Sequence, residues 1–101
     1  MPETTLGDLA VEVRSKNAGP FWVTMELFMA DAAGYAAAAR VVDEALIARL
    51  YRVPEVDVRI FCIPELEVVK ISYPRPVGQG SLRDRDVHAG QHHVPLAGVA
   101  V

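Results

Sequence analysis

Cysteine is almost absent from this sequence of 101 residues, in which Cys62 stands alone. A single thiol cannot form an intrachain disulfide, so the class of small secreted domains stapled by disulfides is excluded. Long apolar runs are also lacking, since none reaches the roughly 18 residues of a membrane helix, and residues 1–7 are polar. These absences predict a cytoplasmic protein that does not associate with membranes.

Basic charge is in short supply, with 10 Lys and Arg against 13 Asp and Glu, a formal net charge of -3 and a pI near 5.5. Such a chain repels a phosphate backbone, so nucleic acid is not an expected partner. Hydrophobic residues make up 51% of the chain, which excludes a disordered protein. Because a chain of this size buries only about two thirds of its surface, we expect some apolar side chains to contact another chain in an oligomer.

The first third of the chain carries two strand patterns. Leu9, Val11 and Val13 alternate with polar or small residues, which indicates a strand buried on one face. Turn-forming residues follow in the segment 15–20, and β-branched and aromatic residues dominate Phe21 to Met29. We therefore predict a hairpin of two strands.

Two helices are predicted next. Asp31 can cap a helix that ends near Arg40, and Asp43 can cap a second helix that stops before Pro54. An acidic residue at the start and a basic residue at the end of the first helix also suit the helix dipole.

The remaining patterns predict a second strand pair and a final edge strand. Residues 56–62 and 66–73 alternate in hydropathy and are expected to pair antiparallel, with Cys62 in a structural, buried position. Residues 96–101 are expected to add an edge strand. Strands flanking a helical block predict a single α+β domain over residues 1–101, a ferredoxin-like sandwich whose mainly antiparallel four-stranded sheet has helices on one face.

The first polar loop, expected at residues 14–21, combines two cations, a hydroxyl, an amide and glycine-freed backbone N–H groups. These donors suit a carboxylate or phosphate oxygen, although a solvated hairpin loop would have the same composition. Its candidate substrate-binding residues are Arg14, Ser15, Lys16, Asn17 and Gly19.

The second polar loop, expected at residues 74–96, is rich in proline, glycine and alternating Arg and Asp, and loops of this length are usually functional. A solvated ion-pair surface is the alternative. Its candidate substrate-binding residues are Arg75, Ser81 and Gln91, and His93 is the candidate catalytic acid or base.

Three histidines in the second loop also raise the possibility of a metal site. His88 and His92 would share a face if the segment were helical, but Gly90 and Pro95 disfavour a helix. No cysteine or carboxylate completes an obvious ligand set. We therefore expect neither a metal nor another cofactor.

The two loops and one helix carry a resemblance to a known family. The chain resembles the domain-of-unknown-function family numbered 4387 over nearly its whole length, and its layout is also similar to the C-terminal ferredoxin-like domain of acyclic-terpene-utilisation A proteins. Two departures are expected, since the family pattern has tyrosine in place of His88 and glutamine in place of His92. The segments that carry the resemblance are Arg14 to Phe21, Leu46 to Tyr51 with Val53-Pro54, Arg75-Pro76, Gly80-Ser81, Asp84, Asp86-Val87, Gly90-Gln91 and His93 to Leu96.

The resemblance implies a detached small subunit that docks beside a large subunit of the acyclic-terpene-utilisation A type. Such large proteins look like enzymes that break down acyl-CoA or branched carboxylic acids. We therefore expect a subunit of a cofactor-independent lyase, hydratase or isomerase that contributes anion-binding loops to a shared site. The alternative is a non-catalytic module for ligand binding, regulation or assembly.

Overall fold

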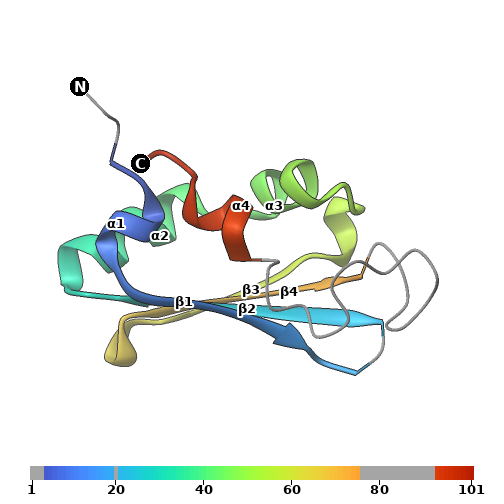
Figure 1. Cartoon of the computed structure of the whole chain (residues 1–101), viewed down its shortest axis with the longest axis horizontal. Coiled ribbons are helices and arrows are strands. Elements are labelled where there is room, and N and C mark those ends of the chain that lie inside the picture. The colour runs from blue at the N-terminus through green and yellow to red at the C-terminus, as the bar shows by residue number, and fades with distance from the viewer. Residues whose placement is uncertain (1–3, 20, 76–92) are drawn as a thin grey trace.

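The computed structural model describes residues 4–19, 21–75 and 93–101 and contains one antiparallel sheet with the strand order β1-β2-β4-β3. The helices lie along one face of this sheet (Figure 1). The predicted α+β class is confirmed, and the arrangement is compatible with a ferredoxin-like sandwich. The strands are β1 (Ala10–Asn17), β2 (Trp22–Met29), β3 (Arg59–Ile63) and β4 (Val68–Pro74), the helices are α1 (Leu6–Leu9), α2 (Ala32–Val41), α3 (Glu44–Tyr51) and α4 (His93–Ala97), and two short 3₁₀ turns are η1 (Glu55–Asp57) and η2 (Pro64–Leu66).

The predicted first hairpin is present, but its turn is shorter than expected. Strand β1 extends to Asn17, and the N–H of Ala18 donates to the carbonyl of Trp22 at 2.9 Å. Gly19 has φ of 79°, a left-handed conformation that glycine adopts without steric cost. The expectation of a loop from Arg14 onward was therefore wrong, because residues 14–17 pair with β2.

Both predicted helix caps are confirmed. The Asp31 carboxylate accepts from the N–H of Gly34 at 2.7 Å, and the Asp43 carboxylate accepts from the N–H of Leu46 at 2.8 Å. Each bond satisfies a donor that the first turn of a helix leaves without a backbone partner. Helix α3 ends at Tyr51, and its C-cap residue Arg52, with a left-handed φ of 57°, turns the chain before Pro54.

The second hairpin pairs β3 with β4 antiparallel, as predicted, although both strands begin later than the alternation suggested. Residues 55–57 form η1, and Glu67, in a left-handed conformation after η2, directly precedes β4. The predicted burial of Cys62 was wrong, since its side chain is exposed. Strand β3 lies at an edge of the sheet, where an apolar sequence pattern does not ensure cover on both faces.

The chain ends differ most from the expectation. Residues 93–97 form α4, and the predicted edge strand is reduced to a single bridge between Ala100 and Thr5. Helix α1 was not predicted, although Thr5 and Asp8 form a capping box at its start. The ends are held together because the N–H of Leu6 donates to the carbonyl of Val99 at 2.9 Å.

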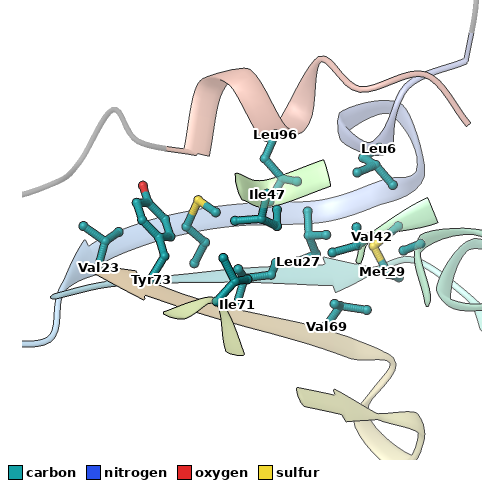
Figure 2. Packing of buried hydrophobic residues seen from close by; sticks show 13 residues of the cluster. Leu6, Val23, Leu27, Met29, Val42, Ile47, Val69, Ile71, Tyr73 and Leu96 are labelled. Atoms are coloured by element: carbon teal, nitrogen blue, oxygen red, sulfur yellow. The ribbon is translucent and has the colours of Figure 1, made fainter. Parts of the chain in front are cut away.

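The hydrophobic core lies between the helices and one face of the sheet (Figure 2). Alternate residues of β2 and β4 point into it, and Val23, Leu27 and Ile71 are fully buried there. No helix in the described part of the chain is long and apolar enough to cross a membrane. Among the described residues, the opposite sheet face has no α-helix over it in Figure 1, and we call it the open face; its side chains include Arg14, Trp22, Glu26, Phe28, Phe61 and Lys70.

The exposure of Cys62 gives a direct test of the edge position of β3. We expect a thiol reagent to label Cys62 in the native protein at a rate within about ten-fold of that in denaturant, because access limits thiol reactivity. Absorbance of the released chromophore measures both rates. Strong protection in the native state would show that the edge of β3 is covered.

Candidate functional site

Four polar side chains from distant segments meet on the helical side of the sheet, near the ends of β1 and β4. Arg75 directly follows β4, is only 8% exposed and donates through Nη1 to the side-chain oxygen of Asn17. The N–H of Arg75 donates to the carbonyl of Phe21 at 2.7 Å, which fixes the backbone at this position. A guanidinium held in this way is a preorganised, planar donor for a carboxylate.

Ser15 and His93 form the second pair in this region. The backbone N–H of His93 donates to Ser15 Oγ at 3.1 Å, and Ser15 Oγ lies 3.2 Å from Nδ1 of the same histidine. A hydroxyl can donate to Nδ1 or accept from it, so this contact supports either neutral tautomer of the ring. The contact engages Nδ1, and Nε2 is the second ring nitrogen that could donate or accept.

Strand geometry brings these two pairs together. Ser15 and Asn17 are two positions apart in β1 and therefore point to the same face, about 6.6 to 6.8 Å apart along the strand. Arg75 is bonded to Asn17 and His93 to Ser15, so both pairs lie on the helical side of β1. We call Ser15, Asn17, Arg75 and His93 the polar cluster.

Tyr51 at the end of α3 supports the helix that carries His93. Its hydroxyl accepts from the N–H of Leu96 in α4 at 3.2 Å, and its ring stacks on Tyr73 with centroids 4.7 Å apart and planes at 28°. Burial raises the pKa of Tyr51 to about 12, although the bond from Leu96 opposes this shift. The ring therefore ties α3, α4 and β4 together next to the polar cluster.

The structure brings together only some of the residues that the sequence singled out. Ser15, Asn17, Arg75 and His93 converge, whereas Arg14 and Lys16 alternate with them in β1 and lie on the open face. The Arg14 guanidinium sits 4.8 Å above the Phe28 ring, and its Nε is 3.7 Å from a carboxylate oxygen of Glu12. Gly19 serves the hairpin turn. Ser81 and Gln91 lie outside the described residues, as do His88 and His92.

Sequence reasoning missed Tyr51, because its helical spacing with Leu46, Ile47 and Leu50 assigned it to an ordinary core position. A tyrosine at a helix end is a weak sign that a hydroxyl needs a partner. The described residues enclose no pocket, so the polar cluster is characterised by its contacts alone. Within these same residues, His, Cys, Asp and Glu form no group of three that could hold a metal.

The family model described as domain of unknown function (DUF4387) matches residues 6–100. The chain belongs to this family. All four residues of the polar cluster fall inside the matched region of this DUF4387 chain. No curated protein and no solved structure matches it.

The contribution of the Tyr51 hydroxyl to the stability of this DUF4387 protein can be tested. Tyr51→Phe keeps the stacked ring but leaves the N–H of Leu96 without its acceptor, so we expect the free energy of unfolding to fall by about 1 to 3 kcal/mol. Urea denaturation followed by circular dichroism measures this change. Phe28→Tyr on the open face adds a hydroxyl without touching the cluster and is expected to change stability little.

The raised pKa of Tyr51 also predicts a pH dependence. The unfolded chain loses this proton near pH 10 and the folded chain only near pH 12, so stability is full below pH 10 and falls as pH rises toward 12. Tyr51→Phe should flatten this part of the stability profile. An unchanged slope between pH 10 and 12 in the variant would contradict the assignment.

Proposed function

We propose that this chain is the small subunit of a two-component, cofactor-independent lyase, hydratase or isomerase that acts on a carboxylate or an acyl-CoA thioester. The polar cluster is its contribution to a site shared with a large subunit that resembles acyclic-terpene-utilisation A proteins. The observation that carries the proposal is the largely buried Arg75 guanidinium, fixed by Asn17 on the same strand face that holds His93 through Ser15.

Arg75 suits an oxygen anion. The planar fork of an arginine matches the two oxygens of a carboxylate. The side-chain oxygen of Asn17 is a neutral acceptor, so this contact orients the guanidinium without cancelling its charge. The same donors can stabilise the negative charge that develops on a carboxylate or thioester oxygen when the neighbouring carbon loses a proton.

His93 supplies the proton transfer in this scheme. When Nδ1–H donates to Ser15 Oγ, the lone pair of Nε2 can take a proton from the carbon next to the carbonyl, and the electron pair moves onto the carbonyl oxygen. Taking this proton turns the ring into an imidazolium, whose Nδ1–H still donates to Ser15 Oγ and whose Nε2–H returns the proton in the reverse step. This exchange is common to isomerisation, hydration and elimination, which is why the three reaction types are proposed together.

The large partner is proposed from the resemblance of the chain to a fused domain of acyclic-terpene-utilisation A proteins. Segments 14–21 and 75–96 of the sequence carry that resemblance, and the four residues of the polar cluster come from these segments. In this assembly the small subunit positions one end of the substrate, and the large subunit supplies the rest of the binding surface.

A non-catalytic binding or assembly module is the second candidate, and one contact favours it. Ser15 accepts the backbone N–H of His93, so this pair also has the structural task of anchoring α4 to β1. In that case His93 would hold the helix in place rather than move a proton.

Substitutions at Arg75 and His93 separate binding from chemistry. In the complex of this chain with its large subunit, we expect Arg75→Lys to weaken binding of isobutyrate or isobutyryl-CoA by about ten-fold or more, because lysine cannot form the paired bonds of a guanidinium. We expect His93→Gln to lower kcat with a much smaller change in KM. Calorimetric titration gives the binding constants and a coupled assay gives turnover.

The matched control is Arg40→Lys in α2, an exposed arginine on a different part of the surface, which should leave binding and turnover within about two-fold. Lys16→Ala should behave like this control, since Lys16 lies on the open face. Equal and small effects at Arg75, His93 and Arg40 would reject the shared site. Loss of binding at Arg75 with no effect of His93→Gln on turnover would favour the non-catalytic module.

A further inference from the structure

The open face has the composition of a protein interface. Arg14 and Arg59 lie over the rings of Phe28 and Trp22, with guanidinium carbons 4.8 Å and 5.9 Å from the ring centroids, and the Phe61 side chain is 50% exposed. Aromatic residues and arginine are enriched at interfaces, and large apolar side chains gathered on one surface mark a contact site. This composition indicates that the open face contacts a partner.

The strand register gives the order of charges across this face. Arg14 lies opposite Glu26, Glu26 opposite Lys70, and Lys70 opposite Phe61. Because cross-strand partners point to the same side, these four side chains form one row across β1, β2, β4 and β3. The row reads positive, negative, positive, aromatic.

This row is complementary to itself under one two-fold operation. When two copies meet face to face about an axis parallel to the strands and midway between β2 and β4, the strand order of one copy is reversed over the other. Glu26 then lies over Lys70 of the second copy, Lys70 lies over its Glu26, and Arg14 lies over its Phe61. An axis across the strands through the same row would instead place Glu26 over Glu26 and Lys70 over Lys70.

We propose that the open face is the interface of a two-fold homodimer in which Glu26 of each copy pairs with Lys70 of the other. Packed sheets rotate by about 30° relative to each other, and this rotation displaces the central strands β2 and β4 least, so the central pairs persist. In the same dimer, the neighbouring row of open-face side chains places Lys16 near Arg59 of the second copy. Both are exposed residues on edge strands, where long side chains can extend into solvent.

The dimer does not depend on the proposed enzymatic role. The polar cluster lies on the helical side of the sheet, so two copies joined through their open faces would leave both clusters accessible to other subunits. A catalytically silent protein would still dimerise, and a monomer could still bind a large subunit.

Charge reversal tests the central pairs. The wild-type chain is expected to sediment as a dimer at tens of micromolar in analytical ultracentrifugation, because stable and specific interfaces bury about 1,200 Å² or more and survive such dilution. Glu26→Lys and Lys70→Glu, each alone, should raise the dimer Kd by about ten-fold or more, because each places like charges across the interface twice. Circular dichroism checks that both variants are folded.

Mixing the two variants isolates the contact between copies. Within each variant chain, positions 26 and 70 still carry like charges, but across a mixed dimer every Lys faces a Glu. An equimolar mixture of Glu26→Lys and Lys70→Glu should therefore recover a dimer with a Kd within about three-fold of wild type, as double-mutant logic requires. The controls Glu55→Lys and Arg49→Glu, exposed residues of η1 and α3, should leave the wild-type dimer unchanged.

Three outcomes would overturn this dimer. A chain that stays monomeric at these concentrations would leave the open face to a different protein. A dimer that is insensitive to Glu26→Lys would use another surface, such as the edge strand β1 or β3. A mixture that remains as weak as its two components would show that the loss came from the cross-strand neighbours within one chain.

Discussion

In the part of the chain that the structure describes, the helices cover one face of the sheet and not the other, and the rest of this molecule depends on that constraint. Side chains of a strand alternate between two faces, and the helices cover one of them, so neighbouring residues enter different environments. In β1 this alternation sends Ser15 and Asn17 toward the helices and sends Arg14 and Lys16 to the open face. A run of polar residues that reads as one loop is thereby divided between two surfaces with different chemistry.

The helical side gathers its polar groups over long distances in the sequence. Ser15 and His93 are separated by 78 positions, and Asn17 and Arg75 by 58. Such contacts require that β4 lie next to β2 and that α4 settle on β1, and the Tyr51 hydroxyl and ring help to hold α4 in that position. The polar cluster thus inherits its geometry from the packing of the core rather than from a local motif.

The open face shows how a chain with a net charge of -3 can present cations where a contact needs them. Two of its arginines lie over aromatic rings, an arrangement that covers apolar surface with the guanidinium while keeping its charge. Glu26 sits between the cations Arg14 and Lys70 in the strand register, which prevents a continuous positive stripe. The net charge of the chain therefore does not predict how charge is distributed on the open face or on the helical side.

The sequence by itself determined the features that depend on neighbouring residues. Asp31 and Asp43 cap the two predicted helices, and the two hairpins and the α+β class are present as expected, because capping and strand alternation are local signals. The DUF4387 family was expected from the resemblance of particular segments, and the family match agrees. The residue types of the site were also available, since arginine, serine, asparagine and histidine were chosen for their donors and their titration. The sequence did not show which of these side chains lie together in the polar cluster.

Tertiary structure alone decided which of those residues meet. The exposure of Cys62 follows from the place of β3 at an edge, and strand order is set by pairing between distant segments. Residues 93–97 became a helix, not part of a strand, because Leu96 is buried in the core and the N–H of Leu96 bonds to Tyr51. Arg75 and His93 lie on the same side of the sheet for the same reason: their partners Asn17 and Ser15 share a strand face, and only packing of the whole sheet against its helices brings Arg75 to Asn17 and His93 to Ser15.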